Sequence, residues 1–138
     1  MQRVTFDTNV FISALTHEGA AARLLILAQE GIFALQMSEA ILNEICKVLV
    51  RDFYWSEDRA TEVQRVLSAI THHVIPHLQL DIVKRDPDDN RILECAQASK
   101  SRFIVTSDKD LLNLRVHEGA AILKPGDFLA LLEHRKLT

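Results

Sequence analysis

The run Phe103-Ile104-Val105 constrains the fold most strongly, because it is apolar without the alternation that a half-exposed strand would show. Such a run predicts a strand covered on both faces, as the strands of parallel sheets usually are. Arg3 to Phe6 is a second short run of this kind, and helical patterns lie between the two runs. Strands that alternate with helices in this way favour a layered α/β domain with a mostly parallel sheet.

Turn and cap residues predict the remaining elements. Further strands are expected at Phe33 to Met37, His73 to Ile75 and Ala121 to Leu123. Helices are expected between the strands, and their limits are marked by residues that break or cap helices: Gly19, Gly31, Ser38, Ser56, Asp86 with Pro87, Asp108 and Pro125. The expected fold is a three-layer α/β/α domain with about five strands in a mostly parallel central sheet, and all 138 residues (1–138) are expected to form a single domain.

The composition is ordinary for a globular protein, with 48% hydrophobic and 25% charged residues. No run approaches the roughly eighteen apolar residues of a membrane helix, and the N-terminus lacks the features of a signal peptide. A cytoplasmic protein is expected, in which Cys46 and Cys95 are reduced and buried. The net charge of -3 argues against a strongly basic nucleic-acid binder, but bound divalent ions can offset catalytic acids locally, so a nuclease stays open.

Two acids lie at or shortly after the ends of expected strands. Asp7 comes after the first strand, and Asp108 follows the run at 103–105 after Thr106 and Ser107. In open α/β sheets, the binding crevice lies outside the carboxyl ends of the strands. Both carboxylates are therefore expected at the same edge of the sheet, although each would also serve as an ordinary helix cap.

Two further acids lie on expected helices. Asp89 falls on the same helix face as Ile92 and Ala96, so its carboxylate is expected to point inward, where a charge is costly unless it is paired. Glu44 borders an apolar stripe, where a pair with Lys47 would explain it equally well. Together, the four acids would form a cage for a hard cation such as Mg²⁺ or Mn²⁺. Two such ions roughly 3.5–4 Å apart support phosphodiester cleavage.

Four segments, in order, resemble the motifs of PIN-domain proteins. They are VTFDTNVFISAL, the segment SEAILNEICKVL that contains Glu44, DPDDNRILECA and FIVTSDKDLLNL. With the closing ILKPGDFL, they are most similar to the VapC-like group of bacterial toxin–antitoxin systems. The resemblance spans nearly the whole chain, and four motifs in order are far more specific than one.

The resemblance implies a parallel sheet, cleavage of RNA with Mg²⁺ or Mn²⁺, and a set of site residues. It implies that Asp7, Asp89 and Asp108 hold the metal directly or through water, and that Glu44 completes the metal shell or orients the water. Around these four catalytic acids it places Asn9, Thr106, Ser107 and Asp110. Asp86 and Asp88 lie close by in the sequence, but the spacing D-x-x-I-x-x-x-A selects Asp89. Many members are homodimers, and the toxins are held inactive by a cognate antitoxin, so both kinds of partner are expected.

Two other functions compete with this one. The strand-end segment FDTNVF faintly resembles the start of haloacid-dehalogenase-like phosphatases, which also use an aspartate and Mg²⁺, but Asn9 stands where that family usually has a second aspartate. A PIN scaffold that binds RNA or a partner without cleaving is the other alternative. The spacing of the acids does not decide between a toxin and an RNA-processing enzyme.

Other clusters have simpler interpretations. The histidines His72, His73 and His77 lack the cysteine or carboxylate pattern of a zinc site, and the aromatic cluster at 53–55 is more typical of a core or dimer contact than of RNA stacking. The basic segment at 134–136 is typical of a solvated terminus. Basic residues that flank the acidic segments could meet RNA phosphates: Arg85, Arg91, Lys109 and Arg115.

Overall fold

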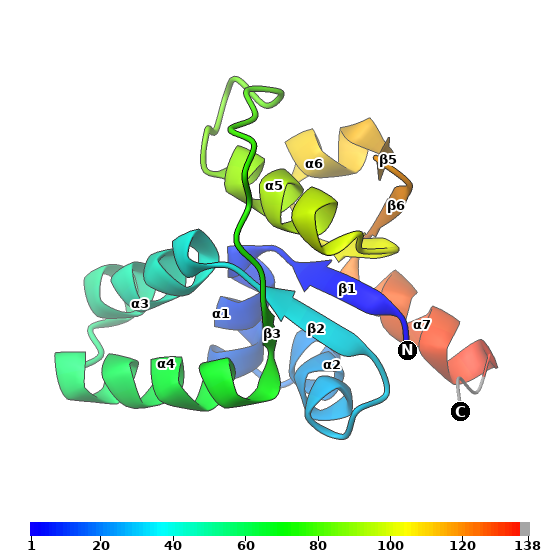
Figure 1. Ribbon diagram of the computed structural model, residues 1–138. Helices are drawn as coiled ribbons and strands as arrows, with labels where there is room; N and C mark the ends of the chain where they lie inside the picture. The colour runs from blue at the N-terminus through cyan, green and yellow to red at the C-terminus, as the bar shows by residue number, and fades with distance from the viewer. Residues whose placement is uncertain (136–138) are drawn as a thin grey trace.

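The computed structural model describes residues 1–135 (Figure 1). In chain order its elements are β1 (Arg3–Phe6), α1 (Thr8–Thr16), α2 (Ala20–Gln29), β2 (Ala34–Met37), α3 (Glu39–Phe53), α4 (Glu57–Ile70), β3 (His72–His73), α5 (Asp89–Ser99), β4 (Phe103–Val105), α6 (Lys109–Leu114), β5 (Val116–His117), β6 (Ala120–Leu123) and α7 (Pro125–Arg135). Lys136, at the end of the expected basic terminus, lies outside the described residues.

One sheet of six strands forms the centre, in the order β3-β2-β1-β4-β6-β5. All neighbouring strands are parallel except the pair of β5 with β6. The order reverses direction beside β1, because the chain first builds outward through β2 to β3 and then returns to β4 on the other side. A crevice outside the carboxyl ends of β1 and β4 is the place where such sheets bind ligands.

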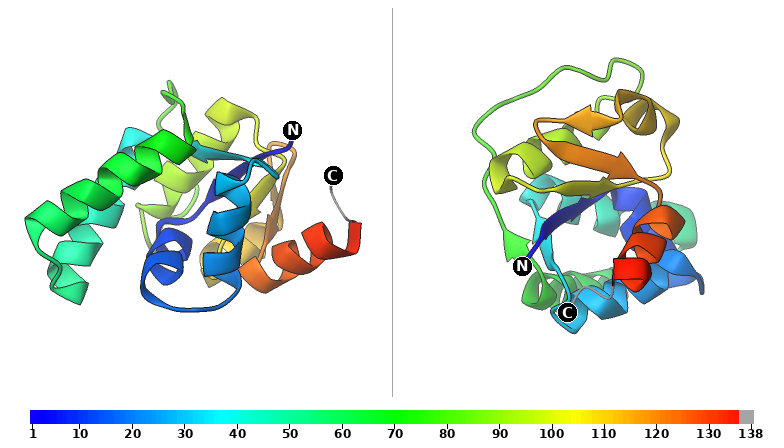
Figure 2. Two further views of the ribbon diagram at one scale, coloured as in Figure 1. Left: turned by 90° about the horizontal axis from the view of Figure 1, so that it is seen from below. Right: turned by 90° about the vertical axis from the view of Figure 1, so that its right-hand side faces the viewer.

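Helices cover both faces of the sheet, as expected for three layers. α1, α2 and α7 lie on one face and α5 and α6 on the other, while α3 and α4 project together from the β2 end (Figures 1 and 2). A row of aromatic rings joins β1 to α7: Phe6 lies 5.9 Å from Phe33, and Phe33 lies 5.4 Å from Phe128, measured between ring centroids. This packing fixes the sheet edge on which Asp7 follows Phe6.

Several expected boundaries are wrong in detail. The sheet has six strands where about five were expected, because Val116–His117 pairs with β6 across a two-residue loop. Glu118 and Gly119 in that loop both have positive φ, 47° and 83°, as a type I′ hairpin turn requires. The third strand is His72–His73 where His73 to Ile75 was expected.

The helix that was expected to open at Asp86 begins at Asp89, after a turn in which the backbone N–H of Asp89 donates to the carbonyl of Asp86. Cys46 is only half-buried, whereas Cys95 is buried as expected, and both thiols are free.

No single helix among the described residues is long and apolar enough to span a membrane. Only α1 and α2 taken together, bent by 97°, have the necessary length and composition.

Candidate metal centre

Asp7 is a buried carboxylate at the end of β1, only 4% exposed. Its backbone N–H donates to the carbonyl of Val105 over 2.9 Å, which joins the end of β1 to the end of β4. Its Oδ1 accepts from the backbone N–H of Asn9 at 3.4 Å and caps α1. Burial raises the pKa of Asp7, and the hydrogen bonds from Thr106 and Asn9 act against that rise. Asp7 is thus both a helix cap and a desolvated acid.

The Thr106 hydroxyl connects the two strand-end acids. It donates to Asp7 Oδ2 over 2.7 Å and accepts from the backbone N–H of Asp108 over 3.0 Å. Asp108 in turn caps α6, because its Oδ1 accepts from the N–H groups of Asp110 and Leu111 at 2.8 and 3.1 Å. The two acids therefore share the same edge of the sheet, as predicted from their places after β1 and β4.

Asp89 is the acid whose burial the fold does not explain. It lies in the first turn of α5 and is 5% exposed, on the same inward face as Ile92 and Ala96, which confirms the predicted orientation. Its Oδ2 is buried and has no hydrogen-bond partner. Burial raises the pKa of Asp89 to about 8, and the nearby carboxylates of Asp108, Asp7 and Asp86 add to the rise. A buried oxygen without a donor requires a proton or a cation.

A third carboxylate reaches the same place from the turn before α5. One oxygen each from Asp86, Asp89 and Asp108 lies within 4.8 Å of the other two, and within residues 1–135 no other set of three acids, histidines or cysteines comes together so closely. Asp7 acts on this group electrostatically, since its charge raises the pKa of Asp89. Carboxylate oxygens are the ligands that Mg²⁺ and Mn²⁺ prefer, so the donor set fits a hard cation.

The remaining predicted site residues are placed less uniformly. Glu44 is half-buried on α3 and lies outside the group of three acids. The pKa of Arg51 is raised chiefly by its hydrogen bond with Asp52 and by the charge of that residue. The charges of Glu44 and Asp88 add to the rise. Asn9, Ser107 and Asp110 instead line an open cleft of about 440 Å³ beside Asp108, together with Arg85 and Lys109.

Asp86 is the member of this acid group that the sequence did not select. The helix spacing predicted the inward direction of Asp89, which its burial confirms, but Asp86 precedes the helix, where no periodicity gives its direction. The repeated acids of DPDDN were the available signal. The three histidines at 72–77 do not form a cluster of three or more ligand residues within the described chain.

Within the aromatic cluster, Tyr54 is 89% exposed and takes a left-handed conformation at the end of α3. Trp55 packs against the core, and the guanidinium carbon of Arg59 lies 3.7 Å from the centre of its ring. Of the two expected roles, core or dimer contact, Tyr54 does not have the first, and the second stays a prediction. The exposed ring follows from the sharp backbone turn between α3 and α4, which directs it away from the core.

Comparisons with known proteins connect this geometry to a family. A family model described as PIN domain matches residues 3–110, which include Asp7, Asp89 and Asp108. The chain belongs to the PIN-domain family. An uncharacterized protein of Methanocaldococcus jannaschii is 36% identical over 118 residues, which cover 82% of this chain and 75% of that protein. PIN domains are generally nucleases, and this activity at the family level favours a nuclease over a phosphatase.

A solved structure supports the same fold. The chain superposes with a TM-score of 0.61 on a chain of the crystal structure of VapBC2 from Rickettsia felis, bound to a DNA fragment from its promoter. The alignment covers 88% of this PIN-domain chain and 97% of the other, at 13% sequence identity. The predicted three-layer α/β/α PIN-like fold is thus confirmed, with one additional strand.

Proposed function

We propose that this PIN-domain protein is a metal-dependent endoribonuclease that hydrolyses RNA phosphodiester bonds with Mg²⁺ or Mn²⁺. The observation that carries the proposal is the buried Oδ2 of Asp89, which has no hydrogen-bond partner and lies among other carboxylates at the sheet edge. A group in that position costs folding free energy unless a ligand compensates it. The family supplies the reaction class, and the oxygen-only donor set favours a hard divalent cation.

Asp7, Asp89 and Asp108 would hold the cation, directly or through water, and Glu44 would complete its shell from α3. A divalent ion bound there would lower the pKa of a water molecule and neutralise charge on the scissile phosphate. Thr106 would keep both acids in place, because its hydroxyl donates to Asp7 Oδ2 and accepts from the backbone N–H of Asp108. Pre-ordered ligands of this kind are a general means of tuning metal affinity.

The cleft beside Asp108 would receive the RNA backbone. Arg85 and Lys109 line it together with Asn9 and Ser107, and both basic side chains are exposed. Arginine and lysine contacts to phosphate position a nucleic acid without reading its sequence. The cleft would therefore orient the phosphodiester next to the acids, while base recognition would come from other surfaces.

The direct test uses purified protein, RNA and added Mn²⁺ or Mg²⁺. We expect cleavage that EDTA stops and that Asp89→Asn abolishes, with the folded state checked by circular dichroism. An Asp88→Asn variant is the matched control, because Asp88 is exposed, carries the same charge as its neighbour Asp89 and lies outside the acid group. Chelator-resistant cleavage by the Asp89→Asn protein would contradict the proposal. Sequencing the ends of RNA cleaved by the wild-type protein would identify the cut site.

We also propose that the protein is a toxin that an antitoxin holds inactive, and that it forms a homodimer. The structural neighbour from Rickettsia felis is part of a complex named VapBC2, which supports a protein partner. An apolar groove of about 290 Å³ between α1, α2 and α4 would suit an apolar segment of that partner, since Ile26 and Val66 beside it are 47% and 45% exposed.

Co-expression with the product of a neighbouring small reading frame tests the partner. We expect a complex that copurifies and suppresses cleavage, and that Val66→Asp weakens without affecting the activity of the isolated nuclease. An RNA-processing enzyme without an antitoxin would instead be indicated by cleavage that no neighbouring gene product inhibits. Light scattering of the isolated protein measures the oligomeric state.

A further inference from the structure

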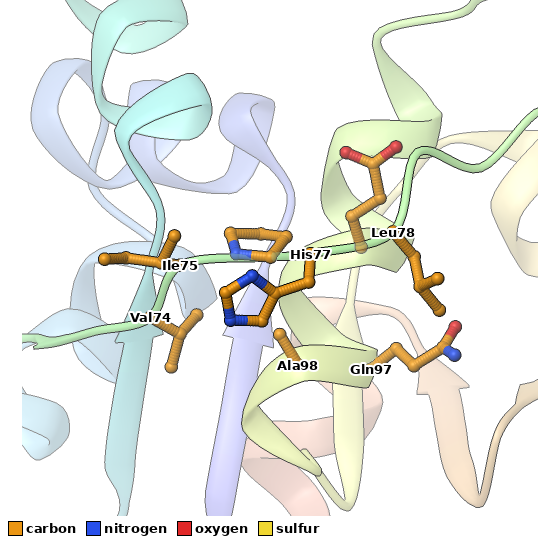
Figure 3. A pocket seen from close by; sticks show the side chains of 8 residues that line it. Val74, Ile75, His77, Leu78, Gln97 and Ala98 are labelled. Carbon is orange, nitrogen blue, oxygen red and sulfur yellow. The ribbon is translucent and has the colours of Figure 1, made fainter.

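The segment between β3 and α5, residues 74–88, is attached by polar contacts with α5 and by the side chain of Val83, which is buried in the hydrophobic core. It runs past α5 and arches beyond the beginning of that helix (Figure 1). Its first part is not packed tightly on the helix, because a pocket of about 420 Å³ lies between Val74–Leu78 and the side chains of Gln97 and Ala98 (Figure 3). Ile75 and Leu78 are 79% and 58% exposed. Beyond Val74, which packs against the core, these two apolar side chains contribute little burial to holding this part of the segment in place.

Asn90 makes the closest attachment. The side chain is fully buried, and its Oδ1 accepts from the backbone N–H groups of Ile82 and Val83 at 2.9 and 2.8 Å. Its Nδ2 donates to the carbonyl of Val83 over 2.8 Å. All three hydrogen bonds thus go to the main chain of the 74–88 segment, and they fix it beside the point where Val83 enters the core.

Glu94 and Arg91 add a second attachment one turn further along α5. Glu94 Oε2 accepts from the backbone N–H of Leu80 over 2.7 Å and from Arg91 Nη2 over 2.8 Å. The same Nη2 of Arg91 lies 3.2 Å from the carbonyl of Leu80. The N–H and C=O of Leu80 are therefore both bound by the ion pair, and the main chain from Leu80 to Val83 is held at two levels of the helix.

Asp86 follows this fixed stretch by three residues. Its Oδ1 accepts from the backbone N–H of Asp88 at 3.2 Å, which stabilises the turn into α5. The carboxylate is exposed at the surface, yet one of its oxygens is within 4.8 Å of oxygens of Asp89 and Asp108. The preceding residue, Arg85, has its Nε 4.0 Å from Oδ2 of Asp110, and this ion pair connects the segment to α6.

We propose that Asp86 is a ligand of the metal ion, supplied by the 74–88 segment, and that Asn90 is the positioning residue that brings it there. The inference rests on the proposed metal site, and the unpartnered Oδ2 of Asp89 is the independent sign that a cation belongs beside it. An exposed carboxylate on an unattached loop would lose conformational entropy on binding the ion. The hydrogen bonds of Asn90 remove much of that loss before the ion arrives.

The test measures Mn²⁺ affinity by isothermal titration calorimetry on the full chain. We expect Asp86→Asn to weaken binding by about tenfold or more, while Asp88→Asn changes it by less than about twofold, since exposed charges are largely screened. Asp88 is the matched control because it is exposed, lies two residues away and carries the same charge. The Asp86→Asn side chain keeps an oxygen that can accept from the backbone N–H of Asp88, so the turn into α5 is retained. Equal affinities of the two variants would overturn the assignment of Asp86.

Asn90 is tested by a double-mutant cycle. We expect Asn90→Ala to weaken Mn²⁺ binding as well, and the double variant with Asp86→Asn to be no weaker than Asp86→Asn alone, because both act through one carboxylate. Additive effects would overturn the positioning role. If Asn90→Ala does not fold by circular dichroism, Glu94→Gln takes its place in the same cycle.

Wild-type protein that takes up no Mn²⁺ would contradict the proposed function itself. Loss of Mn²⁺ binding in Asp89→Asn but not in Asp86→Asn would contradict this inference alone.

Discussion

Asp7 and Asp108 stand where strands end, and Asp86 and Asp89 stand where a helix begins. The strand-end pair is held by the fold: each caps a helix, and the Thr106 hydroxyl joins them. The helix pair has fewer internal partners, since Asp89 Oδ2 has none and Asp86 accepts only within its own turn. The difference indicates that the fold alone accounts for the strand-end acids, while the buried Asp89 requires a proton or a cation.

The largest expected effect comes from Asp89→Asn. We expect cleavage and Mn²⁺ affinity to fall by more than about a hundredfold, because the variant removes a buried ligand and not merely a residue that supports one. Without metal, the variant should unfold at a higher denaturant concentration than the wild type near pH 8, since it removes an unpaired buried charge. Urea unfolding in EDTA measures this. A less stable variant would show that Asp89 supports the fold as Asp7 does.

The next largest expected effect is on the pH dependence of stability. The pKa of Asp89 is raised to about 8 from its ordinary value of 3.8, so its contribution to stability is complete below about pH 4 and is lost as the pH rises through 8. The metal-free protein should therefore lose stability across this range, and added Mn²⁺ should restore it at the high end by binding the ionised carboxylate and compensating its charge. The slope should be much smaller in Asp89→Asn. An equal slope in both proteins would assign the effect to other groups, Asp7 among them.

Thr106→Val tests the other half of the comparison. Valine keeps the shape but leaves Asp7 Oδ2 and the backbone N–H of Asp108 without their partner. We expect a loss of about 1–3 kcal/mol in the free energy of unfolding, together with weaker metal binding. Ser107→Ala, at an exposed neighbouring position, should leave stability unchanged. An unchanged stability of Thr106→Val would mean that the strand-end acids are not joined through this hydroxyl.

The smallest effect is expected for Glu44→Gln. Glu44 lies outside the group of three acids, so its contribution to the cation would be indirect. We expect cleavage to fall by about tenfold, with little change in stability because the side chain is only half-buried. Single-turnover cleavage assays measure this loss. A loss as large as that of Asp89→Asn would place Glu44 among the direct ligands.

The sequence predicted the strand-end acids and Asp89 because each follows a strong local pattern. Asp7 and Asp108 follow apolar strands, and the helix period turns Asp89 inward. Asp86 depends on the hydrogen bonds of Asn90 to a segment without periodicity, so its direction was not predictable. The strand β5 was missed because two residues are too few to show alternation. The place of Glu44 relative to the other acids depends on how α3 packs, which no local pattern specifies.

The hydrogen bond between Thr106 and Asp7 spans 99 positions of the chain. During synthesis, Asp7 leaves the ribosome long before its partner, and β1 has no β4 to pair with until residue 105 has emerged. Contacts this distant in sequence form late, because the loop between them must close first. The acids at this edge of the sheet therefore come together only after β4 has paired with β1, so the acid group is completed late in folding, after the local helices have formed.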